Sequence, residues 1–136
     1  LYGCFCLGPV NTAVFHALSY PLGSLYHLAH GLSNAVLLPW VMEYNMMAVP
    51  HRYADVAEAL GCERSTDALA TARTGVEKIR ELNARCGIPK NLREVGVKEE
   101  TIPQMAAEAM KIQRLLKNNP RVITEQDAIA IFKSAF

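Results

Sequence analysis

Apolar residues dominate the first third of the chain, and their spacing predicts helices rather than strands. Residues 3–19 are apolar on every side, which is typical of a helix buried all round. The Pro-Leu-Gly run at 21–23 predicts the end of that helix. A second buried helix is expected from residue 31 to about 47, with a kink or a displaced turn at Pro39.

From residue 51 onward, apolar positions recur every three or four residues, as on amphipathic helices. One such helix is expected to end at Gly61. The next is expected to be capped by Ser65 or Thr66 and to end at Gly87. Its predicted apolar face comprises Leu69, Ala72, Val76, Ile79, Leu82 and Cys86.

Two further stretches have the form of helix N-termini. Residues 101–104 (T-I-P-Q) resemble a capping box with proline in the first turn, and Thr124 to Asp127 is expected to cap a last helix. A short helical turn is expected at 91–95. Period-two runs and Asn-Gly or Asp-Gly turns do not occur in the sequence, so it predicts one all-α domain of six or seven helices.

Charge is distributed unevenly along this chain. The first charged residue is Glu43, although the whole chain has 14 Lys+Arg, 13 Asp+Glu and a net charge of +1. The uncharged third must therefore be buried, within this chain or against a partner. The near-neutral balance provides no field for nucleic acid or an anionic membrane. Polar, proline and glycine residues interrupt every window of about 20 residues, so a membrane span is not predicted.

The four cysteines do not form a recognisable metal or disulfide pattern. Cys4 and Cys6 are too close for a zinc knuckle, and no second pair follows them. Cys62 and Cys86 stand apart from each other and from the first two. We interpret all four as small apolar core residues in a reducing compartment, the cytoplasm.

Three of the four histidines fall in the uncharged third, namely His16, His27 and His30. Neutral imidazole is the commonest metal ligand in proteins. The turn expected at 21–23 brings His16, near the end of the first helix, back beside His30. Sequence alone leaves two interpretations open, a shared metal or hydrogen-bonded core histidines. A four-coordinate site needs further ligands, and these would come from outside this stretch.

Two motifs then resemble the signature of iron-containing (group III) alcohol dehydrogenases. Residues 16–23 read H-A-L-S-Y-P-L-G and residues 27–39 read H-L-A-H-G-L-S-N-A-V-L-L-P. The family's form is H-A-x-x-H/Y-x-L-G followed by P-H-G-x-x-N-A-x-x-L-P. Its two metal-binding histidines stand fourteen residues apart, as do His16 and His30 here. G-I-P at 87–89, L-R-E-V-G-V at 92–97 and N-P-R at 119–121 are also similar to that family's C-terminal half.

The resemblance implies the helical half of a two-domain enzyme with the dehydroquinate synthase-like fold. Residues 1–136 would be the metal-binding C-terminal domain, and an N-terminal α/β domain binding NAD or NADP is missing from the chain. His16 and His30 would bind Fe²⁺, or Zn²⁺ or another divalent metal, with an upstream Asp and His. His27 is expected to face substrate or cofactor, or to be a structural imidazole, and Tyr20 is expected at the cofactor side.

The resemblance implies an activity that interconverts a small alcohol and its aldehyde or ketone by hydride transfer. The fragment alone is expected to be inactive, and the full-length protein is expected to be a homo-oligomer. Two departures from the family form are present. Tyr20 stands where many members have a second histidine, and Ala29 replaces the usual proline. The alternative is a non-catalytic helical interaction module that retains the fold. A dehydroquinate synthase-like lyase is a third possibility, but it needs basic residues for the substrate phosphate.

Overall fold

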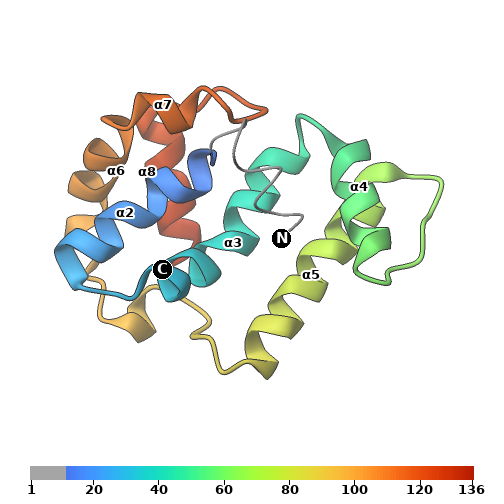
Figure 1. The fold of residues 1–136 in the computed structure, drawn as a ribbon, viewed down its shortest axis with the longest axis horizontal. Coiled ribbons are helices and arrows are strands. Elements are labelled where there is room, and N and C mark those ends of the chain that lie inside the picture. Colours follow the sequence, from blue (N-terminus) through green and yellow to red (C-terminus); the bar gives the residue numbers. More distant parts are fainter. Residues whose placement is uncertain (1–11) are drawn as a thin grey trace.

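The computed structural model describes residues 12–136, and every regular element in that range is helical (Figure 1). The predicted all-α fold is therefore confirmed. The α-helices are α2 (Val14–Tyr26), α3 (His30–Met46), α4 (Pro50–Ala59), α5 (Ala68–Arg85), α6 (Ile102–Met110), α7 (Gln113–Leu116) and α8 (Glu125–Ser134). Two short 3₁₀ helices, η1 (Arg93–Val95) and η2 (Glu99–Thr101), precede α6.

The first helix differs from the prediction. It begins at Val14 and continues through Pro21 to Tyr26, so the predicted end at 21–23 is wrong. Proline costs a helix one hydrogen bond, but Pro21 and the fully buried Leu22 pack into the core. Long-range packing thus outweighs the local signal. The part of the predicted helix before residue 12 lies outside the described residues, as do Cys4 and Cys6.

The second helix, α3, is continuous through Pro39. Proline has no N–H, so it cannot donate to the carbonyl of Ala35 one turn earlier. The side chain of Asn83 on α5 replaces that donor, because its Nδ2 donates to the Ala35 oxygen at 2.8 Å. A side chain distant in sequence therefore supplies the hydrogen bond that Pro39 cannot donate. The displaced turn expected at Pro39 is absent, because α3 continues through it.

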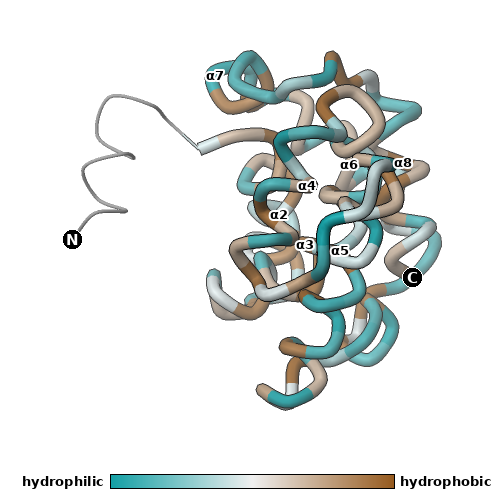
Figure 2. The backbone as a smooth tube through the Cα atoms, turned by 90° about the vertical axis from the view of Figure 1, so that its right-hand side faces the viewer, coloured by the Kyte–Doolittle hydropathy of each residue, from teal (hydrophilic) through white to brown (hydrophobic). Residues whose placement is uncertain are grey.

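The main core lies among α2, the first half of α3, α6 and α8 (Figure 1). Its largest fully buried side chain is Phe132 on α8, and it is continuous with Leu18 and Leu22 of α2, Leu37 of α3 and Met105 of α6. We call this part the body. In Figure 2 hydrophobic and hydrophilic positions alternate along much of the tube, as expected for amphipathic helices.

Helices α4 and α5 form a hairpin to one side of the body, joined to it by α3 (Figure 1). A separate small core of Met42, Met46, Ala72 and Val76 links α3 to α5. Gly75 allows α4 and α5 to approach closely, since an ideal Cβ there would lie 2.7 Å from the Cβ of Ala57.

The predicted apolar face of α5 is buried only toward its N-terminal end. Leu82 is 46% exposed and Cys86 is exposed, so these two residues are not core residues as predicted, whereas Cys62 is half-buried. The N-cap is Asp67, whose side chain accepts from the N–H of Leu69 at 2.8 Å, rather than Ser65 or Thr66.

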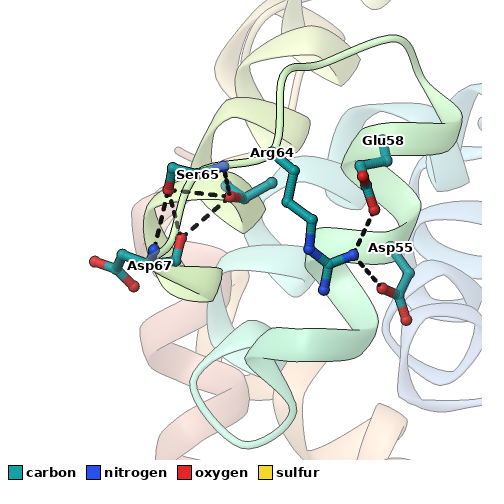
Figure 3. A network of polar contacts seen from close by, with 6 residues as sticks. Asp55, Glu58, Arg64, Ser65 and Asp67 are labelled. Carbon is teal, nitrogen blue, oxygen red and sulfur yellow. Dashed lines mark hydrogen bonds and ion pairs between the residues drawn. The ribbon is translucent and has the colours of Figure 1, made fainter.

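A network of polar contacts links the loop between α4 and α5 to the C-terminal half of α4 and the start of α5 (Figure 3). Arg64 pairs with Asp55 at 2.8 Å and also with Glu58. Ser65 accepts from the N–H of Asp67 at 3.2 Å. These contacts fix the path of the loop, although exposed ion pairs contribute little to the stability of the fold.

The two predicted N-terminal caps have different outcomes. Thr124 caps α8, as predicted, and forms a capping box with Asp127. Thr101 does not cap α6, because its hydroxyl donates to the carbonyl of Lys98 at 2.7 Å and lies 2.5 Å from the hydroxyl of Tyr26. Within residues 12–136, none of the helices has the length and apolar character to cross a membrane.

Candidate metal centre

The structure brings His16 and His30 together. Their ring centroids lie 5.3 Å apart, with the ring planes inclined by 44°. His16 is in the first turn of α2, not near the end of a helix as predicted, and His30 is the first residue of α3. The expected convergence is therefore present, although the helices reach it by another route.

The chain reverses direction at 27–29 rather than at 21–23. His27 adopts the left-handed conformation (φ 54°) and Ala29 is extended. The N–H of Leu28 donates to the carbonyl of Leu22 at 3.3 Å, so the chain runs back along the last turns of α2. An ideal Cβ on Gly23 would lie 3.8 Å from the Leu28 oxygen, so the segment that follows α2 passes close to the backbone of Gly23. This path carries His30 back toward His16.

His16 is half-buried beside an aromatic ring. Phe15 meets it edge-on, with centroids 5.0 Å apart. Its Nδ1 is buried and has no hydrogen-bond partner among the described residues. Burial lowers the pKa of His16, and the neighbouring His30 lowers it further. His16 is thus held neutral, the form in which imidazole binds a metal ion.

His30 is exposed, and one neighbour engages its ring. Nδ2 of Asn34, one helical turn later on α3, lies 3.0 Å from Nε2 of His30. Oδ1 of the same amide is buried without a partner in the described part of the chain. Sequence reasoning gave Asn34 no role. The available signal was its spacing of four from His30, which puts both side chains on one face of α3.

Tyr20 and His27 take no part in the contact between the His16 and His30 rings. Tyr20 lies one turn beyond His16 on α2 and is 44% exposed. His27 is exposed at the end of α2 and is the one described non-glycine residue with positive φ. Histidine tolerates this conformation better than most residues, but it remains uncommon and is often found at functional sites.

Two imidazoles do not complete a metal site. Among residues 12–136, no group of three or more His, Cys, Asp or Glu side chains could hold an ion. A pocket of about 320 Å³ between α3 and the end of α5 is lined by Trp40, Arg80 and Asn83, and it does not include either histidine. Within the described part of the chain, the histidine pair therefore lacks the further ligands that a metal site would need.

Comparisons with known proteins show which family this chain is similar to. The family model described as "Fe-containing alcohol dehydrogenase family, C-terminal" matches residues 1–136. A 1,3-propanediol dehydrogenase of Citrobacter freundii is 43% identical over 129 residues, covering 93% of this chain and 33% of that protein. An NAD-dependent methanol dehydrogenase of Bacillus methanolicus is 37% identical over 121 residues, covering 88% of this chain and 32% of that protein.

Solved structures show the same fold. An alcohol dehydrogenase from Oenococcus oeni superposes with a TM-score of 0.87 at 33% identity, covering 93% of this chain and 33% of that one. The chain spans about a third of the length of the relatives it matches.

Proposed function

Because the chain belongs to the Fe-containing alcohol dehydrogenase family and matches its C-terminal region, we propose that it is the helical, metal-binding domain of an alcohol dehydrogenase. The complete enzyme interconverts a small alcohol and its aldehyde or ketone. Residues 1–136 form one domain, and an N-terminal α/β domain binds NAD or NADP. The coverage of about a third of each relative supports this division, and the name of the B. methanolicus relative supports NAD.

In this proposal His16 and His30 are two of the metal ligands, and the ion is Fe²⁺, Zn²⁺ or another divalent cation. Neutral imidazoles suit all of these ions. Two observations support the assignment. Nδ1 of His16 is buried without a hydrogen-bond partner among the described residues, and burial lowers the pKa of the ring, which favours its neutral form. The remaining ligands are an Asp and a His upstream of this stretch. When bound, the cation acts as a Lewis acid on the substrate oxygen.

The chain's own residues bind and position rather than carry out bond chemistry, because hydride transfer belongs to the nicotinamide. The half-buried face of α2 excludes water from one side of His16, with Phe15 covering the ring edge. Tyr20 and His27 both expose their side chains, which supports a role for both in contacting substrate or cofactor. Neither is assigned a proton-transfer step.

Exposed apolar side chains support a covering partner. Tyr20, Leu25 and Met47 belong to the charge-poor first segment or directly follow it, and each is exposed. We attribute this exposure to contact with the N-terminal domain or with a second subunit of a homo-oligomer. The domain alone is then inactive and self-associating. The two cysteines that the structure describes, Cys62 and Cys86, are free thiols, which supports the reducing cytoplasm as the location.

The observation that carries the proposal is the 5.3 Å approach of the His16 and His30 rings. Metal analysis of the full-length protein tests it. We expect about one divalent ion per chain, lost in His16→Ala and in His30→Ala. His51→Ala is the matched control, because His51 is an exposed imidazole on α4. It should keep the ion.

A wild-type protein that binds no divalent ion would contradict the proposal and favour the second candidate, a non-catalytic interaction module that retains the fold. Tyr20 is the observation in favour of that candidate, since it replaces a second histidine of the family form and presents an exposed apolar ring. Equal metal loss in His51→Ala would show that the ion is not bound at the His16–His30 pair.

A further inference from the structure

Asn34 is the one side chain hydrogen-bonded to the His30 ring in the described structure, and its amide is only half satisfied. Nδ2 lies 3.0 Å from Nε2 of His30, whereas Oδ1 is buried without a partner. An unpartnered buried carbonyl oxygen destabilises a fold, so packing alone would favour an apolar residue of similar size. The asparagine is therefore explained by what it does to His30.

The orientation of the amide follows from the same burial. A half-turn would place the NH₂ group in the position now held by Oδ1. Two N–H donors would then be buried without partners, and buried orphan N–H groups are rarer in proteins than under-satisfied carbonyls. The NH₂ group thus faces the ring. Because NH₂ only donates, Nε2 of His30 must accept and carries no proton, and the neutral ring has its proton on Nδ1.

We propose that Asn34 is a positioning residue that occupies the Nε2 lone pair of His30 until a cation displaces it. The inference rests on the proposed function, in which His30 is a metal ligand. A lone pair that accepts the amide N–H cannot also bind a cation, so the two compete for Nε2. In the metal-free protein Asn34 holds an otherwise exposed ring beside His16. The contact stabilises the metal-free state and makes metal binding weaker and more readily reversible.

The direction in which metal affinity changes when Asn34 is replaced distinguishes this role from that of a group that holds a metal-bound histidine in place. Groups that hold a metal-bound histidine in place strengthen binding, and their loss costs about 10- to 100-fold in affinity. Loss of a competing neutral hydrogen bond should instead tighten binding by roughly two- to tenfold. The direction of the change thus decides between the two roles.

The test titrates Zn²⁺ into metal-stripped full-length protein in competition with a chromophoric chelator. Asn34→Leu should bind Zn²⁺ roughly two- to tenfold more tightly than wild type. Ser33→Ala is the matched control, because the Ser33 hydroxyl donates to the Ala29 carbonyl at 3.2 Å and not to either ring. Its affinity for Zn²⁺ should be unchanged. Asn34→Leu should also unfold at the same or a higher temperature, since the orphaned Oδ1 is gone.

A second measurement needs no variant. The ¹⁵N chemical shifts of His30 in metal-free wild-type protein should show Nδ1 protonated and Nε2 unprotonated. Unchanged or weaker Zn²⁺ binding by Asn34→Leu, or a proton on Nε2, would overturn the inference. His30→Ala separates this failure from that of the proposed function. If His30→Ala loses Zn²⁺ while Asn34→Leu binds like wild type, the role of Asn34 alone is wrong. If His30→Ala binds Zn²⁺ normally, His30 is not a ligand and both proposals fail.

Discussion

The body and the α4–α5 hairpin are both helical, but different side chains hold them together. The body is built on large apolar residues around Phe132, which is fully buried. The hairpin buries mainly small residues, such as Ala57 and Gly75, and its surface carries ion pairs such as Lys78–Glu81 at 2.8 Å. Exposed pairs of this kind contribute little to stability. The body is thus stabilised by the burial of large apolar side chains, and the hairpin by the close approach of the α4 and α5 backbones.

The location of the histidine pair follows from this difference. His16 and His30 project from α2 and α3, whose other faces lie in the more densely built region. A buried ring nitrogen of His16 and a buried amide oxygen of Asn34 have no partner among residues 12–136, and such groups are costly. The large apolar core of the body offsets such a cost, whereas the small core of the hairpin offers less.

The strongest test of the comparison removes the centre of the body. Phe132→Ala should lower the free energy of unfolding by about 3–5 kcal/mol, because it empties a fully buried site. Urea denaturation followed by circular dichroism measures the change. Leu82→Ala on the exposed end of α5 is the control and should stay within about 0.5 kcal/mol of wild type. Similar losses for both variants would erase the distinction between the two regions.

A second test addresses the close approach within the hairpin. Gly75→Ala should destabilise the protein by about 1–3 kcal/mol, because the added Cβ would meet Ala57 at 2.7 Å. Glycine to alanine inside a helix ordinarily stabilises it, so the expected sign is reversed. Gly31→Ala is the control, since an added Cβ there has no neighbour within 4 Å among the described residues. It should be neutral or stabilising in thermal denaturation, and the same result for Gly75→Ala would refute the close-packing argument.

The smallest expected effect concerns the cap of α8, which carries Phe132 into the body. Hydrogen bonds from the Thr124 hydroxyl and then from its backbone N–H lower the pKa of Asp127 from its ordinary value of 3.8. A carboxyl group whose pKa is lower in the folded protein stabilises the fold above its unfolded pKa. That contribution is present at neutral pH and is lost as the pH falls below about 3.8 and through the folded pKa.

Urea denaturation of wild type and Asp127→Asn at several pH values measures this contribution. The variant should be less stable at pH 7, and the difference should shrink toward acid. The expected change is small because the Asp127 side chain is only partly buried. A difference that is constant with pH would show that the charge of Asp127 is not what stabilises the cap.

Much of the fold followed from local patterns because local interactions decide it. The capping box of Thr124 and Asp127 uses side chains three residues apart, and it forms as predicted. Thr101 offered a similar pattern, but the hydroxyl of Tyr26, 75 positions away, lies next to its side chain, which also bonds to Lys98. The exposure of Leu82 could not be predicted from the sequence either. A periodic apolar face does not show how far along α5 the neighbouring helices cover it.

The candidate site shows the same division between local and tertiary information. The sequence shows the fourteen-residue spacing of His16 and His30, and the family resemblance gives that spacing an interpretation as a metal-binding pair. The sequence does not show the contact of Asn34 with Nε2 of His30 or the burial of its other amide atom. Spacing indicates which side chains share a helix face, but burial depends on what the rest of the chain places against that face.

The sequence by itself determined the helical class, the uncharged first segment and the pair of histidines. Tertiary structure alone decided that α2 passes through Pro21, that Asn83 satisfies the carbonyl freed by Pro39, and that the chain reverses at His27. The physical reason is the same in each case. The local penalty of a proline or of a left-handed residue is about 1–3 kcal/mol, and only the packing and hydrogen bonds supplied by distant segments can outweigh it.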